Sequence, residues 1–505
     1  MSPFGSPQFG RFARLTVQND GVPAGPDGIS FESSFEGLRI VFKVEKSPTM
    51  VPNTADISIF NLADSSRRRL KTVRALTTLE AGRPDEIGLI FKGNARTIDH
   101  IRKGADWITR IQCGDGETAY QFSTANQSFK SGTPFKDAAA YLDLSTIAHI
   151  QGRPDDRLVL QALALEIGRV YRQPACAATT PPLRLLAFMA PGDFLANMPI
   201  EFMLQDANVT LDMVYLLPGH PLPQTLPDHD VAIVAVSESS RNQALLRELD
   251  GLVRSWPRPV VNAPDRIARL TRDGTWELLK SALGVAIPIN ARVGRPTMER
   301  IAAGGESLDR VLGGETFPIV ARPLDSHAGE GLEKLDDAAA LGSYLLRRPE
   351  DEFYLAPFID YRGADGLYRK YRIALIAGRP YASHMAVSTH WMIHYLNADM
   401  MGQASRRAEE AQFMASFDRD FAVRHALALD AIAQRAGLDY LPFDCGETRD
   451  GRLLVFETGT NMIVHAMDSP ELFPYKAPQM KKVFAAFEAM LRKVCRRAPG
   501  VAIAA

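Results

Sequence analysis

Residues 440–462 read YLPFDCGETRDGRLLVFETGTNM, in which an Asp-Gly pair at 450 and 451 separates two largely apolar runs. This dipeptide is the strongest short signal for a two-residue β-hairpin turn. With it as the turn, Arg449 pairs with Arg452, and Asp444 pairs with Glu457 further along the same ladder. Directly opposed residues on one face have Cβ atoms about 5 Å apart. The sequence therefore predicts two facing carboxylates.

Two facing carboxylates repel unless a proton or a cation lies between them. The apolar neighbours in PFDC and LVFET argue against the alternative of a solvent-screened pair. A hard divalent cation such as Mg²⁺ prefers carboxylate and phosphate oxygens. Asn461 follows closely enough to offer an amide oxygen, although a turn asparagine is the alternative. We predict a metal site at Asp444, Glu457 and Asn461.

Cationic residues precede this hairpin in two extended segments. The apolar run in FPIVARPLDSHAGEG, residues 317–331, ends at Arg322 and leads into a loop with Gly329 and Gly331. Glycines allow a phosphate to approach the backbone, and the arginine supplies positive charge. In YRKYRIALI, residues 368–376, Lys370 and Arg372 share one strand face with Cα atoms about 7 Å apart. The alternatives are an ordinary glycine hairpin loop and an exposed basic strand face.

Length and composition limit the number of domains and the class of protein. The 505 residues are enough for about three domains, and 46% hydrophobic and 23% charged residues are typical of a globular protein. The net charge of −1 provides no global field to hold nucleic acid or an anionic membrane. The four cysteines lack metal-ligand spacing, and no targeting segment or run of 18 apolar residues is found. We expect a cytoplasmic protein without nucleic-acid or membrane partners.

The patterns predict a multidomain chain. Alternating apolar and polar runs make the first region β-rich, and two helical patterns around a GRPDD turn form a helical hairpin like a single tetratricopeptide repeat. Buried-strand runs then alternate with an amphipathic helix, as in an α/β layer, and an α+β unit follows. The predicted regions are a β-rich domain at 1–140, a helical hairpin with linker at 141–175, an α/β domain at 183–264 and an α+β domain at 265–495.

Two resemblances follow from these motifs. The basic loop, the cation pair, the Asp/Glu hairpin and the downstream Asn resemble, over residues 183–495, the ATP-grasp superfamily of carboxylate-amine ligases, specifically its tetratricopeptide-associated group. MAPGDFLANMPIEFML, FPIVARP, PFIDYRGADGLYRKYRIALI, HWMIHY and FETGTNMIVH carry this resemblance. NTADISIFNLADSSRRRL and the segment 90–134 resemble the β-domain of baseplate hub proteins of contractile-tail phages. That likeness implies a docking partner for the amino-terminal region.

The ATP-grasp resemblance implies an α/β pre-ATP-grasp domain at 183–264 and an ATP-grasp domain at 265–495, with ATP between two α+β lobes. It implies catalytic roles for Lys370 and Arg372 at the transferring phosphoryl group, and Mg²⁺ at the predicted metal site. The residues implied for ATP binding are Arg272, Arg322, Ser326, His327, Gly329 and Gly331 at the phosphates, and the backbone of Ala356, Phe358 and Ile359 at the adenine.

The sequence departs from the family pattern at two points. The family usually spaces its last Glu and Asn by two residues, whereas Glu457 and Asn461 are four apart with Gly459 between them. Arginine stands at both phosphate positions, Arg272 and Arg322, where the family usually has lysine; charge is kept, but donor geometry changes.

Histidines gather near the expected acceptor side. Spacings of six and four residues fit no standard zinc motif, so we predict acceptor binding or a structural role for them. The histidines concerned are His384, His390, His394 and His465. The predicted function is an ATP- and Mg²⁺-dependent ligase that joins a small-molecule or peptide carboxylate to an amine through an acyl phosphate. The alternatives are a kinase on the same fold and a non-catalytic, phage-tail-like structural or nucleotide-binding protein.

Overall fold

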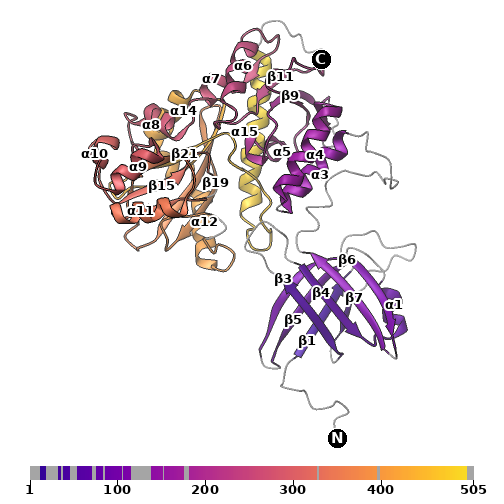
Figure 1. Cartoon of the computed structure of the whole chain (residues 1–505). Helices are drawn as coiled ribbons and strands as arrows, with labels where there is room; N and C mark the ends of the chain where they lie inside the picture. The colour runs from indigo at the N-terminus through magenta and orange to yellow at the C-terminus, as the bar shows by residue number, and fades with distance from the viewer. Residues whose placement is uncertain are drawn as a thin grey trace. The chain divides into compact units, whose positions relative to one another are not determined.

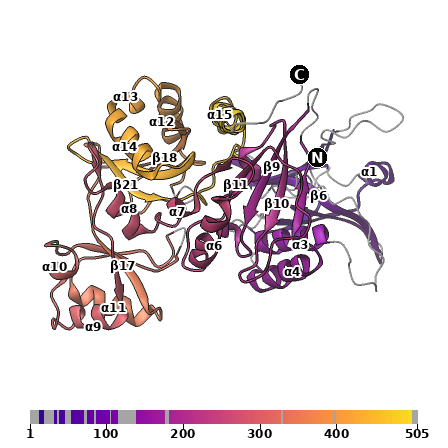
Figure 2. The ribbon, with the colours of Figure 1, turned by 90° about the horizontal axis from the view of Figure 1, so that it is seen from above.

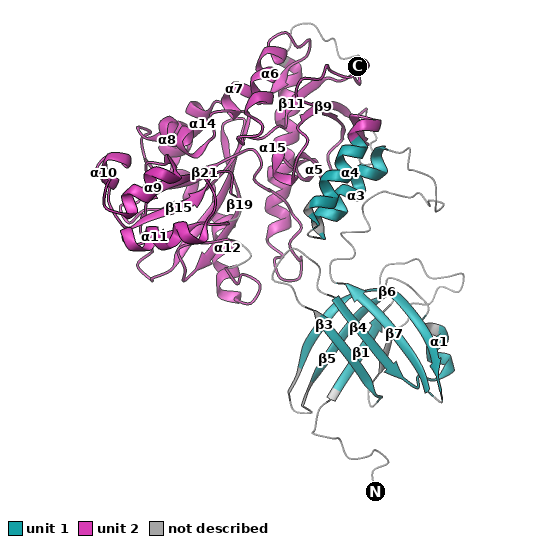
Figure 3. Cartoon of the chain, in the orientation of Figure 1, with its two compact units in different colours: residues 1–164 teal, residues 165–505 magenta. Residues whose placement is uncertain are grey.

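A computed structural model of the chain describes residues 12–18, 32–35, 38–45, 54–70, 75–83, 86–104, 106–114, 138–151, 153–175, 181–326, 329–394 and 398–497. The chain divides into two compact units, Met1–Ala164 and Leu165–Ala505 (Figure 3). The domain boundaries expected from the sequence remain predictions.

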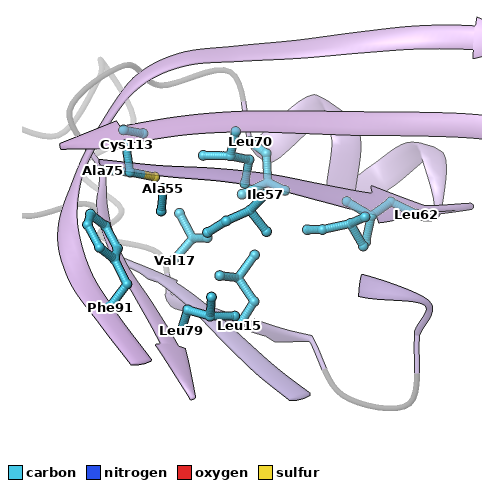
Figure 4. Close-up of a cluster of buried hydrophobic side chains, with 13 residues drawn as sticks. Leu15, Val17, Ala55, Ile57, Leu62, Leu70, Ala75, Leu79, Phe91 and Cys113 are labelled. Carbon is cyan, nitrogen blue, oxygen red and sulfur yellow. The ribbon is translucent and has the colours of Figure 1, made fainter. Parts of the chain in front are cut away.

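The first unit holds one antiparallel sheet in the order β2-β1-β5-β6-β7-β4-β3 (Figure 1). Alternate residues of β4 are buried, so Ala55, Ile57 and Ile59 join the core that Figure 4 shows. The strands are β1 (Phe12–Gln18), β2 (Glu32–Phe35), β3 (Ile40–Glu45), β4 (Thr54–Phe60), β5 (Leu76–Arg83), β6 (Glu86–Lys103) and β7 (Asp106–Gly114), and the helices are α1 (Asp64–Arg69), α3 (Ala138–Ile150) and α4 (Pro154–Ile167). The boundary between the two units falls within α4, after Ala164.

The second unit begins with a mostly parallel sheet in the order β12-β11-β9-β10-β8, in which only β8 pairs antiparallel. β9 is buried along almost its whole length, as expected for a strand covered on both faces. Its elements are β8 (Val170–Gln173), β9 (Leu183–Met189), α5 (Ile200–Met203), β10 (Val209–Tyr215), β11 (Val231–Val234), α6 (Gln243–Val253) and β12 (Val260–Val261).

A four-stranded antiparallel sheet follows in the order β14-β17-β15-β16. Apolar residues of helices α9 and α11 pack with its inner face in one core, which includes Met298, Leu341 and Phe353. Its elements are β14 (Ala291–Gly294), α9 (Arg295–Ala302), α10 (Leu308–Val311), β15 (Ile319–Pro323), β16 (Glu333–Leu335), α11 (Ala338–Arg347) and β17 (Glu352–Pro357).

The last sheet, in the order β13-β21-β20-β18-β19, carries the predicted hairpin. Figure 2 shows α12 and α13 on one side of β18 and α8 on the other. The elements are α7 (Pro264–Ile267), α8 (Arg272–Leu279), β13 (Val285–Ala286), β18 (Tyr368–Ile376), β19 (Arg379–Ser388), α12 (Ala404–Ser416), α13 (Phe421–Arg424), α14 (Ala426–Ala436), β20 (Tyr440–Glu447), β21 (Leu453–Thr458) and α15 (Lys476–Arg497).

The chain is therefore a mixed α/β protein with several sheets, in agreement with the coarse fold class expected from the sequence. Across the described ranges, no helix combines the length and apolar character needed to cross a lipid bilayer.

Candidate functional site

The hairpin of β20 and β21 places Asp444 directly opposite Glu457, as predicted. The predicted turn, however, is wrong. The loop has three residues, 449–451, and is closed by Thr448, whose amide donates to the carbonyl of Arg452 at 3.0 Å. Phe456 is then an extra residue, because Asp444 pairs with Glu457 whereas Cys445 pairs with Val455. The loop is one residue longer than predicted, and the extra residue in the bulge compensates for it, so that Asp444 and Glu457 still face each other.

Asp444 is completely buried, and its charge is compensated by the protein itself. Arg372 donates to both carboxylate oxygens, at 2.7 Å from Nε and 3.0 Å from Nη2, and Lys370 Nζ lies 2.6 Å from Oδ2. Burial alone would raise the pKa of Asp444, but Arg372 and Lys370 outweigh burial and hold the pKa well below its usual value. The two predicted cations of β18 therefore share one face and converge on Asp444.

Glu457 has a different partner. Its Oε2 forms an ion pair with Arg272, the first residue of α8. A buried hydrogen bond of 2.8 Å between the hydroxyls of Thr275 and Thr458 holds α8 against β21. Burial opposes ionisation of Glu457, yet Arg272 and Lys370 lower its pKa to about 2. The facing carboxylates are thus neutralised separately, and their opposition does not require a metal ion, as the sequence argument had assumed.

Arg322, at the end of β15, is buried with 8% of its surface exposed. Its Nε donates to Ser326 Oγ at 3.0 Å, and its Nη2 donates to the Ser326 carbonyl, so Ser326 orients the guanidinium. Burial and then the neighbouring Arg272 lower the pKa of Arg322 to about 9. Among the residues that the structure describes, no carboxylate lies within ion-pair distance of Arg322; Glu457, which pairs with Arg272, attracts Arg322 from further away. A buried cation beside a second cation is a site for an anion.

The six charged residues described above, Arg272, Arg322, Lys370, Arg372, Asp444 and Glu457, form what we call the ionic cluster. Four cations, from three sheet or helix elements, meet two carboxylates, so the cluster carries two excess positive charges at neutral pH. An anion with more than one negative charge matches that excess.

The predicted phosphate loop is described in part. Gly329 has a φ of +79°, and a Cβ there would lie 3.4 Å from Met392 Sδ. Gly331 has a φ of +63°, and a Cβ there would lie 2.6 Å from Pro323, so packing alone demands glycine at this position. Its carbonyl also accepts a hydrogen bond of 2.8 Å from Tyr344. His327 lies outside the described residues.

Backbone pairing reduces the number of amides that are available in the predicted adenine hinge. The amide of Phe358 donates to the carbonyl of Pro318 at 2.9 Å, so this amide is engaged within the protein, and the backbone of Phe358 at the adenine stays a prediction. Ala356, two residues before Phe358, pairs with Val320 in the same antiparallel ladder. Because every second pair of such a ladder is hydrogen-bonded, the amide of Ala356 is engaged as well. The amide of Ile359 forms no hydrogen bond within the described ranges and remains the predicted donor.

Three of the four predicted histidines lie near the ionic cluster. Burial, together with Arg372 and Lys476, lowers the pKa of His384 well below its usual value. Burial also lowers the pKa of His394, which lies near Lys370 and Arg372. The pKa of His465 is lowered in the same way, so all three rings are neutral at pH 7.

His465 also has a defined tautomer and an aromatic neighbour. Its Nδ1 accepts the amide of Met467 at 3.1 Å, so the neutral ring carries its proton on Nε2. The ring centroid lies 6.4 Å from that of Phe202 in α5. By contrast, His390 is exposed on the segment after β19.

A second buried ionic group, which was not predicted from the sequence, contains Glu410 and Lys476, and Lys476 is one of the charges that act on His384. Glu410, on α12, is fully buried and accepts hydrogen bonds from Tyr475 at 2.7 Å and from the amide of Met385 at 3.0 Å. Lys476 Nζ lies 3.2 Å from Glu410 and 3.0 Å from Asp468. Charged residues in helical patterns usually mark a solvated face, so the sequence held no signal for this group.

The donors predicted for Mg²⁺ fit it only in part. Three polar contacts already occupy the oxygens of Asp444, and Lys370 holds the place of a cation there. Within the described residues, no group of three or more His, Cys, Asp and Glu side chains is arranged to hold a metal ion. Glu457, with 31% of its side chain exposed, is the carboxylate that could hold a metal arriving with a polyphosphate. A Cβ at position 459 would lie 2.7 Å from Asn461 Oδ1, so Gly459 leaves room for that amide oxygen.

Comparison with known proteins gives weak structural likenesses. No protein-family model and no curated protein sequence matches the chain. A RimK domain ATP-grasp protein from Sphaerobacter thermophilus is similar over 61% of this chain and 99% of its own, with 18% identity and a TM-score of 0.35. The VanG D-Ala:D-Ser ligase from Enterococcus faecalis is similar over the same shares, with 11% identity and a TM-score of 0.37.

Proposed function

We propose that this protein is an ATP- and Mg²⁺-dependent ligase that joins a carboxylate to an amine through an acyl phosphate. The observation that carries the proposal is Arg322, a buried guanidinium beside Arg272 without a carboxylate partner among the described residues. Guanidinium groups bind phosphate and carboxylate oxygens through paired hydrogen bonds. Arg322 and Arg272 are therefore proposed to bind the phosphates.

The remaining residues of the ionic cluster take different roles from those first predicted. Because Lys370 and Arg372 are held by Asp444, they are proposed to form a fixed positive wall rather than free phosphate ligands. Arg372 Nη1 also donates to the carbonyl of Ile463 at 2.9 Å, which fixes the segment after β21 that contains Asn461. Fixed charges of this kind stabilise developing negative charge without reorganisation.

The bound cofactors supply the reactive phosphoryl group and a divalent charge that neutralises it. Glu457 and Asn461 are proposed to hold the metal, with Asp444 across the hairpin from Glu457. The neutral rings of His394 and His465 are proposed to bind the acid or amine substrate as hydrogen-bonding groups. Small-molecule or peptide substrates and a cytoplasmic location remain part of the proposal, as does a docking partner for the amino-terminal β-sheet unit.

A nucleotide-binding protein without turnover is the second candidate. The compensation of Asp444 by Lys370 and Arg372 favours it, because no metal is needed there. Asp444→Asn separates the two candidates only if the variant folds, so Glu457→Gln is used beside it. A ligase releases ADP as the wild type and loses this turnover in Glu457→Gln. A binding module releases no ADP in either form and retains its nucleotide affinity in the variant.

The test is ADP release by the purified full chain with Mg²⁺-ATP, screened against amino acids, peptides and small diacids as acids and amines. We expect ADP and phosphate only with a matching acid, and an amide product when a matching amine is present. A phosphorylated product that persists without an amine would instead indicate a kinase. Absence of ATP binding by calorimetry would overturn both the ligase and the binding module.

A further inference from the structure

A cavity of about 880 Å³ lies on the face of the last sheet opposite the ionic cluster. Residues of one strand point alternately to the two sides. In β18, Lys370 and Arg372 reach Asp444, whereas Arg369 and Tyr371 line the cavity. Helix α12 and the segment that contains α13 form its outer wall, and the turn between β20 and β21 closes one end.

The floor of the cavity is aromatic. Tyr371 and Phe421 are buried, with ring centroids 4.8 Å apart. Phe413, on α12, is half-buried and lies 4.9 Å from Tyr371 between centroids. A cavity of this volume with an apolar floor is in the range of small-ligand pockets, which run from about 300 to 1,000 Å³. The floor can therefore bind a flat apolar group.

The walls of the cavity are charged, and their charges are largely paired. Two carboxylates outside the lining, Asp360 and Asp365, pair with lining arginines. The lining itself contains four arginines and three carboxylates; these are Arg362, Arg369, Arg424, Arg449, Glu409, Asp420 and Glu447.

Arg449 has a partner that a ligand can replace at low cost. Its ion pair with Asp360 is 3.2 Å long, and 68% of the arginine side chain is exposed. Exposed pairs of this kind contribute about 0–1 kcal/mol. Arg424 is held by two carboxylates: Asp420, which is 56% exposed, and Glu447, which is 26% exposed and also contacts His425. A ligand anion with better geometry can therefore compete for Arg449 and, by replacing Asp420 alone, for Arg424.

We infer that this cavity binds a small anion that carries an aromatic ring. The ring lies against Phe413 and Tyr371, and the anionic group, a carboxylate or a phosphate, pairs with Arg424 and Arg449. This binding does not depend on the proposed ligase activity.

Occupation of the cavity is coupled to the ionic cluster through β18. The Tyr371 hydroxyl donates to Glu447 Oε2 at 3.1 Å, and the neighbouring residues of the strand hold Asp444. A ligand that shifts the backbone of β18 at Tyr371 also shifts Lys370 and Arg372, because the three are consecutive in one strand. The coupling rests on the proposed function, and coupling of this kind is reciprocal between the two ligands.

The test is calorimetry on the full chain with three probes: phenyl phosphate, phenylpyruvate and inorganic phosphate. We expect phenyl phosphate or phenylpyruvate to bind at least tenfold more tightly than inorganic phosphate, and the preferred one identifies the anionic group. Arg424→Gln combined with Arg449→Gln should weaken that binding at least tenfold. Phe413→Leu should weaken it as well while keeping the apolar volume, and this variant decides the matter if the double variant does not fold.

Two controls locate the binding. Arg322→Gln, in the ionic cluster, and Arg300→Gln, an exposed arginine on α9, should leave the affinity for the preferred probe unchanged. Loss of probe binding in Arg322→Gln, equal binding of phosphate alone, or no binding of either ring-bearing probe would overturn the inference. Probe binding that persists in a chain without ATP affinity would sustain the cavity and refute the proposed function alone.

Discussion

Asp444 and Arg322 are both buried charges in the same unit, but their surroundings differ. Asp444 receives two contacts from Arg372 and one from Lys370. Arg322, by contrast, has Ser326 as its one hydrogen-bond partner among the described residues, with Arg272 as a repelling neighbour and Glu457 as an attractive one beyond ion-pair distance. A compensated charge serves the folded state, since its removal leaves its partners buried and unpaired. An uncompensated charge costs stability and is useful only when a ligand completes it. The buried charge without an ion-pair partner is therefore the better indicator of a ligand site.

The largest expected effect breaks the compensated group. Asp444→Asn leaves Lys370 and Arg372 without their carboxylate, and we expect a loss of about 3–5 kcal/mol in the free energy of unfolding. Urea denaturation of the full chain measures it. Glu352→Gln is the matched control, because its ion pair with Arg292 is exposed and should change stability by less than about 1 kcal/mol. Equal effects in the two variants would contradict the importance of burial.

Arg322→Gln should act in the opposite way. Removing an uncompensated buried cation should leave stability unchanged or slightly raised, while the affinity for Mg²⁺-ATP falls by about 10- to 100-fold through the loss of a charged hydrogen bond. Calorimetry and urea denaturation on the same sample check both. Arg292→Gln serves as the exposed-arginine control and should leave the affinity unchanged. A destabilised Arg322→Gln with unchanged affinity would reverse the assignment of roles.

A pH titration sharpens the comparison for the carboxylates. The pKa of Glu457 is lowered from 4.5 to about 2, so the unfolded chain binds more protons than the native chain between these values. The stability that Glu457 contributes is therefore present above about pH 4.5 and is lost as the pH falls towards 2. We expect Glu457→Gln to reduce the slope of stability against pH in this window. An unchanged slope would show that Arg272 does not stabilise the charged form.

The smallest effect tests the turn that sets the register. Gly451 has a φ of +82°, a region that is unfavourable for residues with a Cβ, so Gly451→Ala should cost about 1 kcal/mol. Gly251, within α6, has no such backbone, and a Cβ there would meet no atom within 4 Å. Gly251→Ala should stabilise the chain by roughly 0.5–1 kcal/mol. Thermal denaturation distinguishes these opposite signs.

Part of this arrangement could be predicted from the sequence because strand periodicity is strict. Alternation placed Lys370 and Arg372 on one face, and the Asp-Gly signal brought Asp444 opposite Glu457. The prediction of that pair is confirmed although the two-residue turn is wrong, since the bulge at Phe456 has no sequence signal.

Compensation of charge could not be predicted in the same way. Whether Asp444 meets Mg²⁺ or Lys370 depends on side-chain distances, and the pairing of the Phe358 amide with Pro318 depends on the register between β15 and β17. The Glu410 and Lys476 group joins helices far apart in the chain, and residue type alone does not reveal such a contact.

The Phe456 bulge makes the site sensitive to insertions and deletions that never touch it. If one residue is added or removed between Thr448 and Arg452 and the loop still closes over three residues, the ladder shifts by one residue. Unless the bulge disappears or a second one forms, Phe456 then takes the place of Glu457 opposite Asp444. The length of this exposed turn therefore helps to determine which residue faces Asp444 in the buried ionic cluster. Loops grafted onto this hairpin should keep three residues.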